Sequence, residues 1–153
     1  VGEADFTKTM MRELGDVAFW RIAMRPGRPM AVGRIGQALL FGLPGNPVAV
    51  VVTFLTFVRP ALLRRMGAAV TEWPTVRARS TQAVRKKPGR TEYQRCVLQQ
   101  DPDGHWNASL TGQQGSGVLS SVVQADGLMV LGHAQDQVQP GDWVDVVLLQ
   151  GLT

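Results

Sequence analysis

The chain has 153 residues, of which 44% are hydrophobic and 18% charged, a balance typical of a soluble globular protein with one domain or two small ones. The most apolar stretch, 48–58, ends at Arg59, short of the roughly 18 residues that a membrane helix needs, so we do not expect an integral membrane protein. A single cysteine, Cys96, and the lack of a basic head followed by an apolar signal core favour a reducing, cytoplasmic location.

The charges are divided unevenly along the chain. Residues 1–95 hold all 16 Lys and Arg against six acidic residues, a net charge of +10, whereas residues 96–153 hold six acidic residues and no Lys or Arg, a net charge of −6. Thirteen of the basic residues are Arg, whose planar fork of donors suits phosphate and other oxyanions. The first part therefore carries either an anion-binding surface or a solvated basic surface.

The N-terminal segment has no initiator Met and opens with a turn-like sequence, residues 1–5, as in a piece of a larger protein. Thr7 is a suitable cap for a short helix over residues 8–14. The alternation from 17 to 25 then predicts a strand. One face would hold Trp20, Ile22 and Met24 in the core, and the other would hold Phe19, Arg21, Ala23 and Arg25.

After a turn at 26–29, residues 30–35 and 38–41 predict a hairpin or two short strands around Gly36. Then comes the strongest local signal, Gly-Leu-Pro-Gly-Asn-Pro at 42–47. Asn46 is a favoured helix cap, so a buried helix is expected from Pro47 to near residue 67, kinked or broken by Pro60. The turn before this helix either offers backbone N–H groups to an oxyanion or is an ordinary tight turn.

The sequence pattern changes after the linker-like pair Trp73 and Pro74, where short strand-like segments replace helical periodicity. This pattern predicts a small all-β domain, either a barrel or a sandwich. The expected strands are 75–83, 92–99, 106–111, 128–131 and 143–149.

Two loops of this β domain could bind anions. The basic loop 85–90, followed by Tyr93 and Arg95, is a solvated hairpin tip, a general anion site or, last in order, a nucleic-acid patch. The glycine-rich loop 112–117 offers backbone donors and a hydroxyl, and is equally ordinary as a turn. His105 and His133 have no Cys or His partner at ligand spacing, so zinc is not expected, and no Walker, Rossmann or Gly-x-Ser-x-Gly motif is present.

Taken in order, several short motifs resemble the C-terminal part of the molybdopterin molybdenumtransferase family, the bacterial MoeA type, and the similar E domain of gephyrin. No single motif is sufficient to indicate the family, but the ordered series of motifs spans the whole chain. The residues that carry the resemblance are Val1–Asp5, Thr7 and Lys8, Arg25–Pro29, Gly42–Pro47, Pro88–Arg90 with Gln94 and Arg95, and Gly112 with Gln114, Gly115 and Ser116.

The resemblance implies a fold in two pieces and a fragment of a longer protein. Residues 1–72 would be the second half of a three-layer α/β/α domain that holds the pterin, and residues 75–153 would be a small C-terminal β-barrel. The implied reaction inserts molybdate into adenylylated molybdopterin, with magnesium-dependent release of AMP. The full-length protein would be a homodimer, and this fragment alone would be inactive.

The resemblance also implies roles for particular residues. Asp5 matches an acidic position important for activity and would organise magnesium. Arg21 and Arg25 stand where the family commonly has lysines that face phosphate and molybdate. The substrate loop would comprise Pro44, Gly45, Asn46 and Pro47, and the barrel would contribute Arg95 and Ser116 to molybdate binding. Two other classes remain open: a gephyrin-like scaffold that binds peptides, and a nucleic-acid-binding module.

Overall fold

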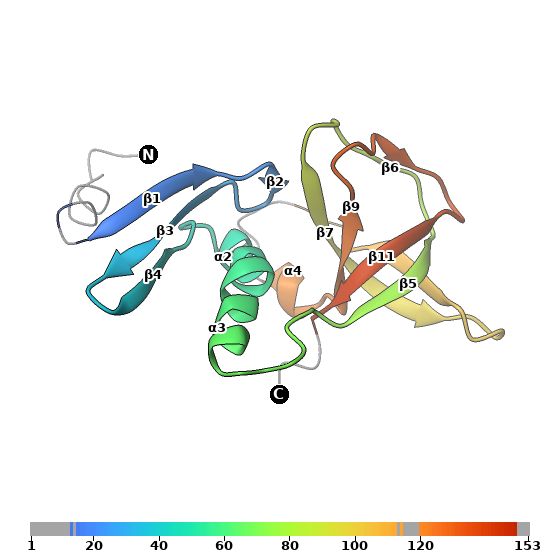
Figure 1. Cartoon of the computed structure of the whole chain (residues 1–153). Helices are drawn as coiled ribbons and strands as arrows, with labels where there is room; N and C mark the ends of the chain where they lie inside the picture. Colours follow the sequence, from blue (N-terminus) through green and yellow to red (C-terminus); the bar gives the residue numbers. More distant parts are fainter. Residues whose placement is uncertain (1–12, 14, 113, 115–119, 150–153) are drawn as a thin grey trace.

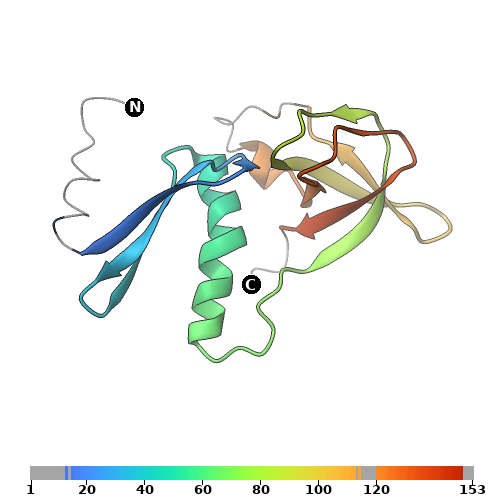
Figure 2. The same cartoon turned by 45° about the horizontal axis from the view of Figure 1, so that its top comes forward.

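The computed structural model describes residues 13, 15–112, 114 and 120–149. Its first part contains an antiparallel sheet in the order β1-β3-β4 and one long helix (Figures 1 and 2). The hairpin predicted around Gly36 is confirmed, with Ile35 paired to Ala38. The strands of this part are β1 (Asp16–Arg21), β2 (Met24–Arg25), β3 (Pro29–Ile35) and β4 (Ala38–Gly42).

The continuous strand predicted over residues 17–25 is wrong. Strand β1 ends at Arg21, and the chain resumes as the two-residue strand β2, which leaves the antiparallel sheet and pairs in parallel with β7 of the second part. Trp20, expected in the core, is 60% exposed, whereas Met24 is buried. The alternation continues in the sequence, but the two ends of the segment pair with different sheets.

The long helix consists of α2 (Pro47–Thr53), a π-helical turn η1 (Phe54–Val58) and α3 (Arg59–Arg65), which follow one another without a gap. Proline lacks the N–H that an α-helix needs at Pro60, and the chain accommodates it with the wider turn just before, where the Arg59 N–H donates to the Phe54 carbonyl. Pro60 therefore neither ends nor splits the helix.

The length of this helix also bears on the expectation that the chain is not an integral membrane protein. The apolar run was counted as ending at Arg59, but the helix continues through it, and Pro47–Arg65 is long and apolar enough to cross a membrane, with a mean hydropathy of 1.6. A core helix of a soluble protein meets the same criterion. Because Val52 is buried among side chains from both parts of the molecule and Ala49 lines a cavity with polar walls, we interpret α2 and η1 as the core part of this helix, whereas α3 has no buried residues.

The second part is a closed β-barrel, which is one of the two architectures, barrel or sandwich, that the sequence predicts. Strands β7, β8, β5, β11 and β9 are hydrogen-bonded in that order, and the pairing of β7 with β9 closes the ring (Figure 1). The core is filled by small and branched side chains such as Ala78, Ala108 and Val146, together with the long side chain of Met129. The elements are β5 (Thr75–Ser80), β6 (Val84–Arg85), β7 (Thr91–Gln100), β8 (Trp106–Leu110), α4 (Ser120–Val123), β9 (Gly127–Leu131), β10 (Gln137–Val138) and β11 (Trp143–Leu148).

The two parts are joined by hydrogen bonds and by a shared core. Strand β2 extends the barrel sheet, with Met24 opposite Thr91 and Arg25 opposite Glu92. Met24 from β2, Val52 from α2 and Leu128 from β9 form one buried cluster. The fold class is therefore confirmed as a mixed α/β part followed by a β-barrel, and the junction places strand, helix and barrel residues side by side.

Candidate anion site at the junction

A cavity of about 640 Å³ opens at this junction. The turn after β2, the loop before α2 and one side of strand β7 form its walls. Five predicted site residues line it: Arg25, Pro44, Gly45, Asn46 and Arg95. The other lining residues are Pro26, Gly27, Pro29, Ala49, Arg85, Glu92, Tyr93, Gln94 and Gln114.

The cavity is cationic, since Arg25, Arg85 and Arg95 line it with Glu92 as the one acidic side chain among its lining residues. Arg95 is only 2% exposed. Burial lowers the pKa of its guanidinium, but arginine starts from so high a pKa that the group stays charged at neutral pH. A fixed positive charge in a shielded place attracts an anion more strongly than an exposed one does.

The backbone of Arg95 is held by the side chain of Gln114. The Arg95 N–H donates to Gln114 Oε1 at 2.9 Å, and Gln114 Nε2 donates to the Arg95 carbonyl at 2.9 Å. The same amide nitrogen also donates to the Thr111 carbonyl at 2.8 Å. The glycine-rich loop is thus tied to the strand that carries Arg95.

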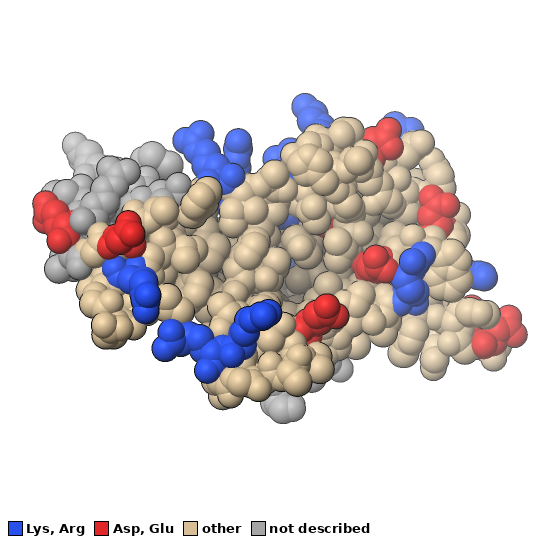
Figure 3. All heavy atoms as spheres, in the orientation of Figure 1, with Lys and Arg blue, Asp and Glu red and all other residues tan. Residues whose placement is uncertain are grey.

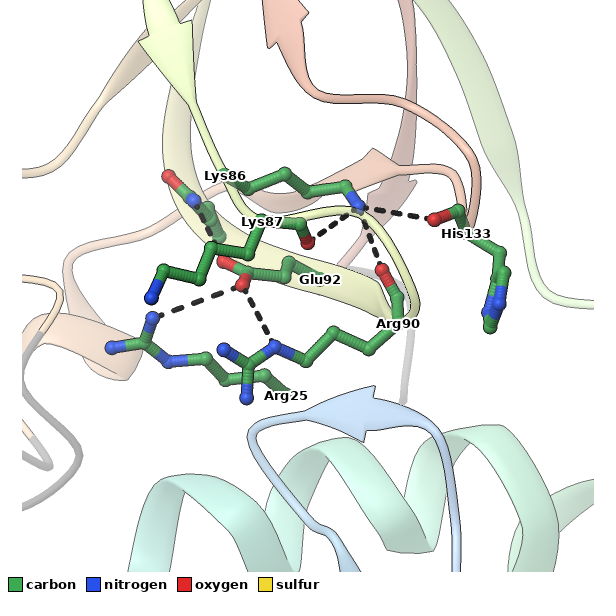
Figure 4. A network of polar contacts seen from close by, with 7 residues as sticks. Arg25, Lys86, Lys87, Arg90, Glu92 and His133 are labelled. Atoms are coloured by element: carbon green, nitrogen blue, oxygen red, sulfur yellow. Dashed lines mark hydrogen bonds and ion pairs between the residues drawn. The ribbon is translucent and has the colours of Figure 1, made fainter.

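Glu92 organises the cations at the edge of the cavity (Figure 4). Its side chain is buried, and its Oε1 lies 3.7 Å from Arg25 Nη1 and 3.4 Å from Arg90 Nε. Gln94 Nε2 donates to the other carboxylate oxygen at 3.2 Å. One buried carboxylate therefore holds two guanidiniums, of which the Arg25 side chain remains 63% exposed.

The loop before α2 shapes the cavity, and of the two alternatives left open for it, a site with free helix N–H groups or an ordinary tight turn, its hydrogen bonds favour the turn. Asn46 Oδ1 accepts hydrogen bonds from the backbone of Val48 at 3.1 Å and of Ala49 at 3.3 Å, as the predicted helix cap. Pro47 occupies the first helical position and has no N–H. Because the first donors of the helix are already used, an anion here is bound by side chains, and Pro47, which is exposed, is not among the lining residues.

Arg21 and Arg25 do not share one face, contrary to the strand prediction. The break after β1 places Arg25 in the junction cavity and Arg21 in a smaller basic cavity and an apolar groove. On the face shown in Figure 3, basic side chains gather near β2 and near the end of α3. The two expected catalytic arginines are thus assigned to different cavities.

Two other predicted residues, Asp5 and Ser116, lie outside the described residues. Sequence reasoning missed the role of Glu92 in the cavity wall, whereas Arg85 and Tyr93, which also line it, belong to the basic segment considered as a general anion site. A signal existed for Glu92, because it directly follows the basic loop in a segment predicted as a half-buried strand, where a carboxylate needs a cationic partner.

A turn between β7 and β8 brings Asp101, Asp103 and His105 together, with one potential ligand atom from each within 4.8 Å of the others. Asp101 Oδ1 accepts backbone hydrogen bonds from Asp103 at 3.0 Å and His105 at 2.8 Å. The bond from His105 is the main reason why the pKa of Asp101 is lowered. These bonds explain the cluster as a turn, and we assign no metal to it.

A closed barrel that shares a cationic cavity with an α/β part defines a two-part protein with a site suited to anions. Comparison with known families matches residues 1–64 to the "Probable molybdopterin binding domain" and residues 77–149 to the "MoeA C-terminal region (domain IV)". The chain belongs to the MoeA family of molybdenum cofactor biosynthesis proteins.

Relatives support the same assignment. The molybdopterin molybdenumtransferase of Haemophilus influenzae is 36% identical over 149 residues, which cover 95% of this chain and 36% of that protein. Gephyrin of Dictyostelium discoideum is 31% identical over 172 residues, covering 97% of this chain and 24% of its own length. The chain therefore spans about a third or less of these relatives.

Solved structures of similar proteins support the same family assignment. The molybdopterin biosynthesis MoeA protein of Pyrococcus horikosii superposes with a TM-score of 0.79 and 31% identity, covering 97% of this chain and 36% of that one. A molybdenum cofactor biosynthesis protein of Pyrococcus furiosus gives a TM-score of 0.72 and 32% identity, covering 88% of this chain and 46% of that one.

Proposed function

We propose that this chain forms part of a molybdopterin molybdenumtransferase, which inserts molybdate into adenylylated molybdopterin and releases AMP. The observation that carries the proposal is the junction cavity, where Arg25 and Arg95 meet the loop of Pro44 to Asn46. The relatives bearing that name are about three times as long, so the complete reaction belongs to the longer protein.

The chemistry of the cavity suits this task. Molybdate is a tetrahedral dianion that must approach two thiolates, which repel it. Fixed cations lower the energy of such a charge when they are already in place before binding. Arg95 is buried and its backbone is held by Gln114, and the Arg25 guanidinium lies 3.7 Å from Glu92, so both cations line the cavity before a ligand arrives.

Further parts of the proposal rest on the family resemblance. Asp5 would organise magnesium, Ser116 would contact molybdate, Arg21 would act on the pterin phosphate, and the complete protein would be a cytoplasmic homodimer. The domains would be residues 1–72 and 75–153. The lone thiol of Cys96, which is free and buried, is consistent with a reducing compartment.

Molybdate titration of the 153-residue chain tests the proposal. Arg95→Met keeps the volume of this buried side chain close to its original value and removes the charge, and should raise the Kd for molybdate at least about tenfold. Arg79→Gln, an exposed change on β5 that does not line the cavity, should leave the Kd within about twofold. An unchanged Kd for Arg95→Met, with circular dichroism showing a folded protein, would remove the cavity from the proposal.

A further inference from the structure

Glu92 lies in the interior of a sheet at the point where the two parts of the molecule join. Its backbone is opposite Arg25 of β2 on one side and opposite Leu131 of β9 on the other. Its side chain is only 5% exposed, and Gln94 Nε2 donates to its Oε2 at 3.2 Å. Because its backbone is paired on both sides and its carboxylate is buried, the position of this charge is set before any ligand arrives.

The other carboxylate oxygen, Oε1, faces two guanidiniums (Figure 4). It lies 3.7 Å from Arg25 Nη1 and 3.4 Å from Arg90 Nε, and within the described part of the chain this buried atom accepts no hydrogen bond. Charge-assisted hydrogen bonds of this kind are about 2.7–2.9 Å long, so both contacts are ion pairs at longer range. Glu92 therefore attracts the two guanidiniums without using up their N–H donors.

The backbone that carries Arg90 is anchored, so the basic loop is not a loose hairpin tip. Lys86 Nζ donates to the Arg90 carbonyl at 2.7 Å. The Thr91 N–H donates to the Ala23 carbonyl at 2.9 Å, which ties the end of the loop to the segment that enters β2. These bonds bring Arg90 and Arg25 to the same carboxylate.

A carboxylate in a cationic cavity acts on an incoming anion in two opposite ways. Its charge repels the anion, but it also keeps together two guanidiniums that would otherwise repel each other. The Arg25 side chain is 63% exposed, and among the ion pairs between described residues it takes part in the one with Glu92 alone. Without that carboxylate, the Arg25 guanidinium would be free to turn toward solvent.

We propose that Glu92 is a positioning residue for molybdate in the junction cavity. It orders the Arg25 guanidinium in advance, and this gain exceeds the repulsion between its own charge and the anion. A side chain that is already ordered loses less conformational entropy when a ligand binds. The inference rests on the proposed function for the identity of the anion, and Glu92 acts on that anion through Arg25.

Titration calorimetry of the 153-residue chain with molybdate tests this role in two variants of Glu92. Glu92→Gln keeps the size of the side chain and removes its charge, whereas Glu92→Asp keeps the charge on a shorter side chain. Glu92→Gln should raise the Kd at least about fivefold, and Glu92→Asp should raise it less. Asp145→Asn, which removes the carboxylate of the exposed ion pair with Arg77, is the control and should leave the Kd within about twofold.

The order of the two variants separates positioning by charge from the alternatives. Tighter binding by Glu92→Gln would show that repulsion dominates, and a larger loss in Glu92→Asp than in Glu92→Gln would show that the side chain only fills space. Either result would overturn the inference. In the Arg25→Gln background, Glu92→Gln should change the Kd by less than about twofold, and a full fivefold loss there would show that Glu92 does not act through Arg25.

Nuclear magnetic resonance relaxation of the Arg25 Nε–H group, without any anion, gives a second and independent measurement. The group should be more ordered in the parent chain than in Glu92→Gln, and equal order would overturn the inference whether or not molybdate binds. If the parent chain bound no molybdate and Arg25 still lost order in Glu92→Gln, the proposed function would fail, while the ordering of Arg25 by Glu92 would be supported.

Discussion

The side-chain amide of Gln114 runs along Arg95 as a neighbouring strand would, accepting from its N–H and donating to its carbonyl, both at 2.9 Å. Strand β8 pairs with β7 as far as Leu110, opposite Cys96, and the carbonyl of the preceding residue, Arg95, accepts from both the Thr111 N–H, at 2.9 Å, and the Gln114 amide. A buried cation is thus positioned by a glutamine nineteen residues away in the sequence.

Gln114→Ala should lower the free energy of unfolding by about 1–3 kcal/mol, because it leaves the buried backbone of Arg95 with fewer hydrogen bonds. It should also weaken molybdate binding several-fold by loosening Arg95. Urea unfolding and calorimetry measure the two effects. Gln99→Ala, an exposed change on the same strand, is the matched control, and an equal loss in both variants would contradict a special role for Gln114.

Gly27→Ala should destabilise the junction by more than about 1 kcal/mol. Gly27 has a φ of +99°, which side chains disfavour, and a Cβ there would collide with Thr53 Cγ2 on α2. Thermal unfolding checks this. Gly36 also has a positive φ, of +58°, but a Cβ added there would have no atom within 4 Å, so Gly36→Ala should lower the free energy of unfolding by less. Equal losses would show that backbone strain alone matters.

Cys96 should make the protein less stable above about pH 9. Burial raises the pKa of its thiol to about 12, from an ordinary value of 9.0. Above pH 9 the unfolded chain releases this proton and the folded chain keeps it, so the free energy of unfolding falls by up to about 1.4 kcal/mol per pH unit. Urea unfolding at pH 8–10.5 measures the slope, and Cys96→Ala should show a shallower one. Parallel slopes would contradict the assignment.

Leu128→Ala should cost about 2–5 kcal/mol and lower the stability of both parts together. Leu128 belongs to the barrel but packs with Met24 and Val52 of the first part in one buried cluster. Hydrogen exchange of amides in α2 and β9 measures the coupling. Leu62→Ala, at an exposed position on α3, should cost less than about 1 kcal/mol. Faster exchange in β9 alone would show that the barrel is an independent unit.

Arg25→Gln should weaken molybdate binding several-fold and Arg21→Gln should not, because only Arg25 lines the junction cavity. Arg21→Gln is therefore the matched control, with the same change of charge four residues away. Titration calorimetry distinguishes the two. Equal losses would restore the single basic face that the sequence alternation suggests.

Local signals in the sequence were sufficient for much of the fold. Asn46 and Pro47 begin the helix where capping preferences predict, and the long strands of the barrel lie close to the predicted ones. The break after Arg21 could not be predicted, because the alternation of side chains continues through it and only the pairing partner changes, from β3 to β7. Periodicity reports which residues are exposed, but not which strand they pair with.

In the candidate site, too, some features could be predicted from the sequence and others depend on tertiary contacts. Arg25, Arg95 and the Pro44–Asn46 loop could be predicted from the family resemblance, and the structure brings them to one cavity. The role of Glu92 depends on two contacts, with Arg25 across β2–β7 and with Arg90 two residues earlier, and the first of these is a tertiary contact. Continuation of the helix through Pro60 likewise depends on a π-turn that has no simple sequence signal.

The parallel pairing of β2 with β7 limits how the junction cavity can exchange its ligand. Met24 and Arg25 belong to the first part of the chain but are hydrogen-bonded into the barrel, so the two parts cannot swing apart without breaking backbone bonds and opening the buried cluster around Leu128. The Arg25 side chain, which is 63% exposed, can change rotamer on a nanosecond scale. Exchange of a ligand at this cavity therefore involves movements of side chains such as Arg25, while the backbone of the junction stays paired.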